Sequence, residues 1–316
     1  MTMTSAVDSR LEPSEGSGRR TRSKLSRTGS GAAFVAPFLL VYVLFLVVPL
    51  VMGLVTSLTD AGLAGGRADF VGLANFAEAL RDPAVWQSFG VTLVFTAVSA
   101  PLLILTGLIM ALLTHHLVSA RWLWRLAFFA PYVLPSSAVA LIFVWVYQPE
   151  FGLADGLLAG LGADPMGWLS EPVPAMAGVV LTTIWWTAGF NFLLYLAALQ
   201  AIPGDLYEAS ALDGASRWQQ LFRITLPMLK PTTGLVAVLQ VLASLKVFDQ
   251  FYLITGGGPQ QTTRPILQYI YESGFTHYRT GYASAISYTF FAIIFIVTLA
   301  RYGKAIRRKG RPASHV

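Results

Sequence analysis

Long apolar stretches alternate with short polar segments along this 316-residue chain. Runs of 18 or more apolar residues are typical of transmembrane helices, because about 20 helical residues cross the hydrocarbon core of a bilayer. The pattern predicts six spans, at about residues 32–58, 88–113, 126–147, 175–199, 232–254 and 282–301. We therefore expect an all-α integral membrane protein with one six-span domain at residues 29–305 and basic tails at 1–28 and 306–316.

The composition supports a membrane location. Hydrophobic residues make up 55% of the chain and charged residues 12%, whereas about a quarter of a soluble domain is charged. The chain has no cysteine, which excludes disulfides, thiolate metal sites and cysteine nucleophiles. The tail at 1–28 is rich in serine, glycine and arginine, and we expect it to be disordered because it has too few apolar residues to pack.

Basic residues are distributed unevenly over the predicted loops. If the N-terminus is cytoplasmic, 17 Lys and Arg residues lie in the two tails and in the second and fourth loops. The opposite loops contain four, namely Arg67, Arg81, Arg264 and Arg279. Since basic loops stay on the inner side, both termini are predicted to be cytoplasmic. Basic tails can bind nucleic acid, but beside membrane spans we interpret them as orientation signals next to anionic lipid, with no nucleic-acid partner.

The polar segment EASALDGASRWQQLFRITLPMLKP, residues 208–231, lies between the fourth and fifth predicted spans. Just before it, Asp205 can cap a short helix, and Glu208 three residues later completes a pattern like a capping box. Asp213-Gly214 predicts the end of this helix, because glycine adopts the left-handed conformation without a Cβ clash.

A second short helix should follow this turn. Ser216 with Gln219 repeats the capping pattern, and Pro227 and Pro231 are expected to stop the helix and angle the chain into the next span. The residues alone fit two interpretations equally well. One is an amphipathic linker at the membrane surface, and the other is a docking knob for a soluble protein.

EASALDG followed by ITLP resembles the EAA loop of ABC importer permeases, whose pattern is roughly E-A-A-x-x-D-G-A, a spacer and I-x-L-P. In that family the loop forms the coupling helix, which sits in a cleft of the ATP-hydrolysing subunit and passes its motion to the spans. Ser210 replaces the second alanine and is small enough to keep close packing. The resemblance implies that these residues couple the chain to the ATPase: Asp205, Glu208, Ala209, Ser210, Asp213, Gly214, Ala215, Arg217, Ile224, Leu226 and Pro227.

Three further segments resemble the same family: FVGLANF at 70–76, RWLWRLAFFAPYVLP at 121–135 and SLKVFDQFYLITGGGP at 244–259. The last is similar to the carbohydrate-uptake group, in particular to the first permease subunit of maltose, lactose and glycerol-3-phosphate systems. Val91, Ala130 and Asp155 depart from the family pattern. These departures bear on substrate identity and not on class.

The resemblance implies the fold of a type I ABC importer permease in the cytoplasmic membrane of a prokaryote. Its expected cargo is a sugar, an oligosaccharide or a related polyol. The implied partners are a second homologous permease, two ATP-binding subunits or one homodimer, and an extracytoplasmic solute-binding protein. The chain itself is expected to hold no cofactor, since ATP and magnesium belong to the ATPase subunits.

Enzyme signatures are absent from the sequence. No G-x-x-x-x-G-K-[ST] phosphate loop occurs, and TGGGP at 255–259 lacks the lysine. His115 and His116 are adjacent, which is not the spacing of helical metal ligands, and His277 and His315 lie in a loop and a tail. We therefore expect no catalytic residue and no metal site.

Polar side chains within predicted spans are costly and indicate function. Lys246 and Asp249 are three residues apart, so they share a helix face and can pair. A structural ion pair and the polar lining of an outer mouth both fit them. Asn191 requires a partner in mid-span, either a substrate or another helix. The candidate path residues are Trp186, Phe190, Asn191, Tyr195, Gln240, Ser244, Lys246 and Asp249.

Two other classes of function remain possible at this point. An ABC permease for another small solute, such as an amino acid or a polyamine, would share the coupling loop. An ion-coupled secondary transporter would need acidic groups at its core and would leave the segment at 205–228 without a purpose.

Overall fold

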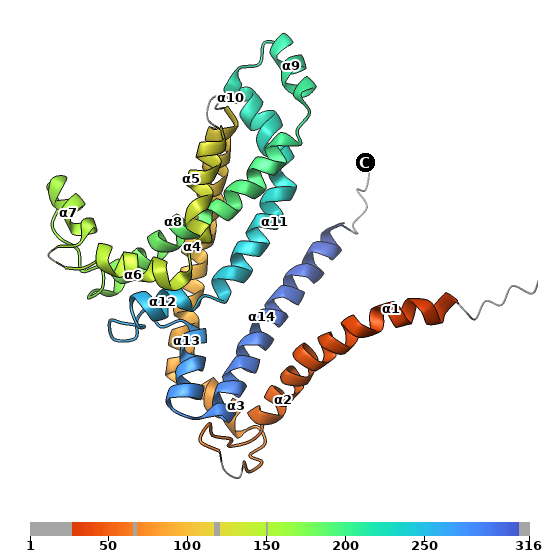
Figure 1. Ribbon diagram of the computed structural model, residues 1–316, viewed down its shortest axis with the longest axis vertical. Coiled ribbons are helices and arrows are strands. Elements are labelled where there is room, and N and C mark those ends of the chain that lie inside the picture. Colours follow the sequence, from red (N-terminus) through yellow and green to blue (C-terminus); the bar gives the residue numbers. More distant parts are fainter. Residues whose placement is uncertain (1–26, 66–67, 117–120, 150, 310–316) are drawn as a thin grey trace, which may run out of the picture. The chain divides into compact units, whose positions relative to one another are not determined.

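The computed structural model describes residues 27–65, 68–116, 121–149 and 151–309 (Figure 1). Over these ranges the chain is helical, and its one extended pairing is an isolated bridge between Thr59 and Phe70. The predicted all-α class is therefore confirmed. The tail expected to be disordered at 1–28 lies outside the described residues except for its last two positions, and the tail at 306–316 is described only to Lys309.

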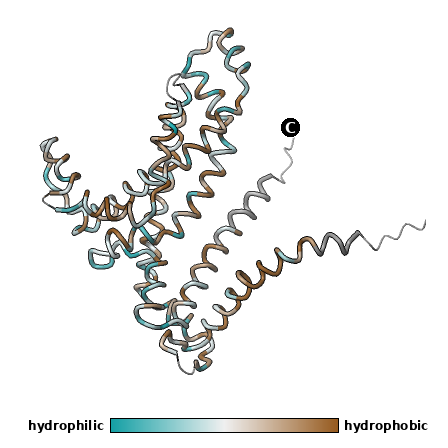
Figure 2. Tube along the Cα trace, viewed as in Figure 1, coloured by the Kyte–Doolittle hydropathy of each residue, from teal (hydrophilic) through white to brown (hydrophobic). Residues whose placement is uncertain are grey.

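The chain divides into two units, residues 1–52 and 53–316. The described part of the first unit belongs to a helical run that begins as α1 (Arg27–Tyr42), widens into the π-helical turn η1 (Val43–Val47) and continues into α2 (Val48–Ser57), whose last five residues belong to the second unit. From Phe34 to Val55 its residues are apolar on every side of the helix (Figure 2). A helix of this kind is suited to contact with lipid.

The second unit holds the remaining helices. In chain order they are α3 (Ala74–Arg81), α4 (Pro83–His116), α5 (Arg121–Val133), α6 (Ser136–Val146), α7 (Leu153–Gly160), α8 (Pro172–Gln200), α9 (Gly204–Leu212), α10 (Arg217–Gln220), η2 (Leu221–Thr225), α11 (Leu226–Leu245), α12 (Asp249–Ile254), α13 (Ile266–Tyr271), η3 (Glu272–Thr276) and α14 (Thr280–Lys309). Here α4 packs along α8 and α11, and α5 packs against α8. The buried apolar residues form three clusters: one between α4, α8 and α11, one between α4, α6, α8 and α12, and one that joins α3, α4 and α11 to α13 and α14.

Glycines allow the central helices to approach closely. A Cβ at Gly107 of α4 would lie 2.5 Å from the Cβ of Asn191 in α8. A Cβ at Gly189 of α8 would overlap the carbonyl oxygen of Phe128 in α5. Small residues at such crossings are typical of helices packed within a membrane. These two positions fix how α8 sits against both neighbours.

In the described ranges, four helical segments are long and apolar enough to cross a membrane: Phe34–Ser57, Pro83–His115, Pro172–Gln200 and Arg217–Leu245. The pair α5 and α6 is bent by 95° and adds a fifth segment if it counts as one broken span. The apolar part of α14, Thr280–Ile296, is shorter. These segments overlap the six predicted spans. The number of six spans stays a prediction, with which the segments are consistent.

Two predicted helix ends were wrong. Pro227 and Pro231 do not stop the second loop helix, because α10, η2 and α11 form one helical run from Arg217 to Leu245. The wide π turn at η2, just before Pro227, relaxes the i−4 contact that normally excludes proline from a helix. The fifth predicted span, 232–254, is instead broken after Leu245, where Phe248 adopts φ −144° and ψ −62°.

Candidate coupling loop and candidate substrate path

The first loop helix, α9, starts two residues earlier than the sequence predicted. Its N-cap is Pro203, and no side chain caps it. The predicted cap at Asp205 is therefore wrong, because Pro203 holds an extended conformation (φ −60°, ψ 131°) that places the helix start directly after it. Asp205 lies in the first turn instead, where a carboxylate still interacts favourably with the helix dipole.

Gly214 ends α9 as predicted. Its φ is +77°, which is the left-handed conformation that glycine adopts at low cost. The backbone amide of Ala215 donates to the carbonyl of Ser210 at 2.9 Å, and that of Gly214 donates to Ala211 at 3.0 Å. This pair of bonds is the Schellman pattern. A Cβ at Gly214 would meet no atom within 4 Å, so the position requires glycine for its conformation and not for space.

The predicted capping box after the turn is confirmed. The backbone amide of Ser216 donates to Oε1 of Gln219 at 2.7 Å, and the amide of Gln219 donates to Oγ of Ser216 at 3.3 Å. These two bonds satisfy free donors at the start of α10. The turn at Gly214 and the cap at Ser216 together set the angle between the two loop helices.

A set of side-chain bonds that the sequence did not reveal holds α9 against the next helix. Nε2 of Gln220 donates to Oγ of Ser210 at 2.9 Å and to the carbonyl of Tyr207 at 3.2 Å. Oγ of Ser210 donates to the same carbonyl at 2.9 Å, and the hydroxyls of Tyr207 and Thr225 lie 2.9 Å apart. The only sequence signal was a serine at an alanine position of the motif.

The tip of the loop is exposed in the isolated chain. Leu212 is 90% exposed and Trp218 is 71% exposed, and Glu208, Ala209, Asp213 and Arg217 are exposed as well. Further along, Ala215, Ile224, Leu226 and Pro227 are half-buried. Large apolar side chains that protrude from a preformed polar loop mark a surface for a protein partner.

Beside this tip lies a groove of about 710 Å³. Its lining comes from the loop and from the ends of α4 and α8, and consists of Leu112, Leu113, His115, Leu199, Tyr207, Arg217, Trp218, Gln220, Leu221 and Thr225. The groove adds to the surface around the loop that is available to a protein partner. Trp218 forms part of its wall and stacks on Phe222, with ring centroids 6.1 Å apart.

Two predicted path residues form a buried bond between helices. Nε2 of Gln240 in α11 donates to Oδ1 of Asn191 in α8 at 2.7 Å, and Nδ2 of Asn191 donates to the carbonyl of Leu103 in α4 at 3.1 Å. Both side chains are buried. The structure thus shows the interhelical partner that an amide in mid-span requires, and the two residues tie the three core helices together.

The other aromatic and hydroxyl candidates also pack between helices. Tyr195 is buried in the core between α8 and α11, and Oγ of Ser244 lies 3.3 Å from Oγ of Ser99 in α4. Trp186 donates through Nε1 to the carbonyl of Leu134 at 3.1 Å. Phe190 stacks on Tyr132 at 5.5 Å. Trp186 and Phe190 are half-buried and lie at the bend between α5 and α6.

Lys246 and Asp249 do not share a helix face as predicted, and they form no ion pair, which was one of the two interpretations left open. Lys246 is the C-cap of α11, and Asp249 begins α12 beyond the break, so the two do not share a helix face. The ion pairs found in the described residues are Arg264–Glu272 and Arg279–Glu78. Both Lys246 and Asp249 are exposed in the isolated chain, at the position where the helix is interrupted.

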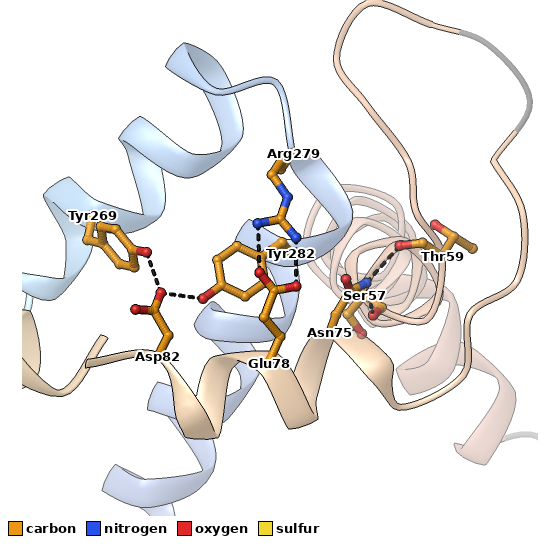
Figure 3. A network of polar contacts seen from close by, with 8 residues as sticks. All are labelled: Ser57, Thr59, Asn75, Glu78, Asp82, Tyr269, Arg279 and Tyr282. Atoms are coloured by element: carbon orange, nitrogen blue, oxygen red, sulfur yellow. Dashed lines mark hydrogen bonds and ion pairs between the residues drawn. The ribbon is translucent and has the colours of Figure 1, made fainter. Parts of the chain in front are cut away.

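The start of α4 carries a denser polar network (Figure 3). Oδ2 of Asp82 accepts hydrogen bonds from the hydroxyls of Tyr269 at 2.5 Å and Tyr282 at 2.6 Å. Glu78 and Arg279 form a bidentate pair at 2.8 and 2.7 Å. These contacts fasten α3 to α13 and α14.

Charge and hydrogen bonding shift the acidity of this network. Burial raises the pKa of Asp82, but the hydrogen bonds from the two tyrosines and the amide of Ala84, with the nearby Arg264 charge, outweigh it and lower the pKa below its usual value.

Asn75 of α3 connects this end of the chain to the residues that follow α2. Its side chain donates to the carbonyls of Ser57 at 3.0 Å and Thr59 at 2.8 Å.

Asp155, one of the positions that depart from the family pattern, organises the loop around α7. It is buried, and its Oδ1 accepts hydrogen bonds from Nε1 of Trp168 at 2.9 Å and from the amide of Met166 at 3.1 Å. Trp168 in turn stacks on Tyr147 at 5.3 Å. A carboxylate at this position thus serves to fix the loop.

Comparison with known proteins shows which family has this arrangement of helices. Residues 103–310 match the family described as "Binding-protein-dependent transport system inner membrane component". The sulfoquinovosyl glycerol transport system permease protein SmoG of Agrobacterium fabrum is 36% identical over 276 residues, which cover 87% of this chain and 89% of the relative. The trehalose/maltose transport system permease protein MalF of Thermococcus litoralis is 34% identical, over 85% and 91% of the two chains. The lactose transport system permease protein LacF of Rhizobium radiobacter is 31% identical, over 92% and 99%.

Solved structures give the same result for the fold. A chain of a bacterial ABC transporter involved in the import of the acidic polysaccharide alginate superposes with a TM-score of 0.77 at 26% identity, over 90% of this chain and 97% of that chain. The alginate transporter in complex with a pentasaccharide-bound periplasmic protein matches in fold with a TM-score of 0.78, over 91% and 97% of the two chains, at 24% identity. The fold is that of an ABC importer permease. The chain belongs to the family of inner membrane components of binding-protein-dependent transport systems.

Proposed function

We propose that this chain is a permease subunit of an ATP-driven importer that carries a sugar, an oligosaccharide or a related polyol. The observation that supports this most is the loop α9–α10, whose Schellman turn at Gly214 and capped second helix present an exposed tip. The relatives named for sulfoquinovosyl glycerol, trehalose and maltose, and lactose favour a carbohydrate cargo.

In this proposal the loop docks in an ATP-hydrolysing partner, and both termini lie in the cytoplasm of a prokaryotic cell. The chain itself hydrolyses nothing. ATP and magnesium are held by two partner subunits, a second homologous permease completes the membrane unit, and an extracytoplasmic binding protein delivers the cargo. The family description, which names binding-protein-dependent transport, supports this assembly.

Coupling follows from the rigid connection between the loop and the bundle. The loop's second helix runs without interruption from Arg217 to Leu245, so a displacement of the docked tip moves α11 as a unit. Through Gln240 and Asn191 the same helix is bonded to α8 and α4. ATP-driven closure of the partner subunits would then shift the core helices and alternate access between the two sides.

The substrate path would use the exposed and half-buried candidates. Lys246 and Asp249 lie at the break between α11 and α12, where a helix interruption leaves backbone groups and charged side chains available to a polar cargo. Trp186 and Phe190 offer aromatic faces at the bend of α5 and α6. The buried residues Asn191, Tyr195, Gln240 and Ser244 would hold the helices that form this path.

The test begins with an affinity-tagged chain purified from native membranes in mild detergent. We expect two ATP-binding subunits and a second permease to co-purify. After reconstitution, the cognate binding protein should stimulate ATP hydrolysis when loaded with one of a panel of trehalose, maltotriose, lactose and alginate pentasaccharide. Stimulation by an amino acid or a polyamine instead would replace the sugar assignment, and uptake driven by an ion gradient without ATP would overturn the importer.

The orientation of the chain in the membrane is tested separately. Reporter fusions near residues 160 and 268 should give an outside signal, and a fusion near 215 should give an inside signal. An outside signal at 215 would contradict docking of a cytoplasmic ATPase on the loop.

A further inference from the structure

Four aromatic side chains, three of them exposed, form a continuous cluster beyond the end of α11. The rings of Phe248 and Tyr252 lie 5.1 Å apart at 16°, and those of Tyr271 and Phe275 lie 5.2 Å apart at 27°. The two pairs meet through Tyr271, which is 5.4 Å from Phe248 and 5.5 Å from Tyr252. We call these four residues the aromatic platform.

The platform is open in the isolated chain. Phe275 is 57% exposed, and Tyr252 and Tyr271 are also exposed, whereas Phe248 is half-buried. The rings come from two separate segments, the break with α12 and the junction of α13 with the π-helical turn η3. Single-turn π-helices are rare and occur frequently at functional sites. Core packing does not account for a four-ring surface of this exposure.

Charge argues that this surface does not face lipid. Asp249 lies three residues before Tyr252, so the two share one side of α12. Lys246 lies just before the break, and both charged side chains are exposed. A charged side chain in the bilayer interior costs about 2.5–3.5 kcal/mol even on the lower scales. The side of the helix that carries the platform therefore faces water, a cargo or another protein.

We propose that the aromatic platform is a sugar-stacking subsite of the transport path, with Asp249 as a hydrogen-bond acceptor for the hydroxyl groups of the sugar. Pyranose rings present apolar CH faces that pack on aromatic rings, while their hydroxyls require polar groups placed at the edge. A row of rings suits successive units of an oligosaccharide. This inference rests on the proposed sugar import and assigns it a contact surface.

The first test uses the absence of cysteine from the chain. Phe275→Cys places a single thiol on the platform, and Tyr278→Cys is the matched control, because Tyr278 is 56% exposed and lies outside the platform. The complete reconstituted importer, with binding protein and ATP, is labelled with a membrane-impermeant maleimide. At about ten times its KM, the transported sugar of the panel should slow labelling of the cysteine at 275 about tenfold and leave the control unchanged.

Two outcomes of this labelling overturn the platform as a subsite. One is a rate at position 275 that the sugar does not alter. The other is a thiol that is blocked in the sugar-free complex but reactive in the isolated chain, which would assign the surface to the second permease.

The second test separates stacking from packing at Tyr271. Tyr271→Phe keeps the ring and should hold the KM for uptake within about twofold, whereas Tyr271→Leu keeps apolar bulk without the ring and should raise KM about three- to tenfold at unchanged kcat and membrane abundance. Equal KM values for the two variants would overturn the inference while the wild-type complex still imports sugar. A wild-type complex that imports none of the panel would instead contradict the proposed function itself.

Discussion

The two ends of α4 are built in different ways. At its start, α3, α13 and α14 are fastened by side-chain bonds, with two tyrosine hydroxyls on Asp82 and a bidentate pair between Glu78 and Arg279 (Figure 3). At its far end, the loop α9–α10 is shaped mainly by backbone turns and helix caps. The hydrogen bonds of the Gln220 side chain add a connection between α9 and α10. The first end uses its polar groups internally, and the second leaves a tip with Leu212 and Trp218 exposed.

This difference indicates which end a partner must complete. An internally satisfied network is stable by itself, whereas an exposed tip with large apolar side chains lowers its free energy further when another protein covers it. Changes at the α3 end should therefore alter the stability of the isolated chain, and changes at the loop should alter assembly and coupling.

Gly214→Val should have the largest effect. A β-branched residue in a left-handed conformation costs about 1–2 kcal/mol, and the loop can avoid this cost only by redirecting α10. We expect uptake and binding-protein-stimulated ATP hydrolysis to fall about tenfold or more. The matched control is Gly204→Val, because this glycine also meets no atom within 4 Å but has no positive φ. Equal activity of the two variants would remove the turn from the coupling mechanism.

Asp82→Ala should act on stability alone. The change leaves two tyrosine hydroxyls without their acceptor, and we expect a loss of about 1–2 kcal/mol in the free energy of unfolding, allowing for the partial exposure of the site. Thermal unfolding of the purified chain in detergent measures this. Co-purification of the ATP-binding subunits should persist; its loss at an unchanged melting temperature would contradict the division between the two ends.

Ser210→Ala and Gln220→Ala should each cost about 1 kcal/mol, since both remove the same bond between α9 and α10. The double variant should therefore cost less than the sum of the single ones. The informative readout is the ratio of sugar imported to ATP hydrolysed, which should fall in both single variants while melting temperatures change little. If the loss of unfolding free energy in the double variant equalled the sum of the two single losses, the two side chains would act separately.

Acid should weaken the α3 end selectively, by the smallest amount. The pKa of Asp82 is lowered in the folded chain, so the stability it contributes is complete above the unfolded-state value of about 3.9 and is lost as the pH falls through the folded-state value. Melting temperatures measured from pH 6 to pH 3 should fall more steeply for the wild type than for Asp82→Asn. Parallel curves would show that the carboxylate is not the group responsible.

The sequence predicted the helical class and most of the loop, because apolar run length, a glycine after an aspartate and a Ser-x-x-Gln box are local signals. The predictions from sequence were wrong where neighbouring residues override these local signals. Pro203 displaced the cap expected at Asp205, and the π turn at η2 let the helix pass Pro227, while Pro231 lies inside α11.

Long-range partners were also beyond the sequence. The break after Leu245 separated Lys246 from Asp249, and no spacing rule indicated that Gln240 would bond to Asn191, 49 residues away. The bond set around Gln220 and the network on Asp82 likewise join segments that only the folded chain brings together.

Site-specific cross-linking tests the central claim, docking of the loop tip in an ATPase, most directly. The chain has no cysteine, so Leu212→Cys, at a position 90% exposed, can carry a single photoreactive label in the assembled complex. We expect a cross-link from position 212 to an ATP-binding subunit, and none to that subunit from the same label at Tyr278→Cys. A label at 212 that reaches only lipid, or that reaches the extracytoplasmic binding protein, would contradict it.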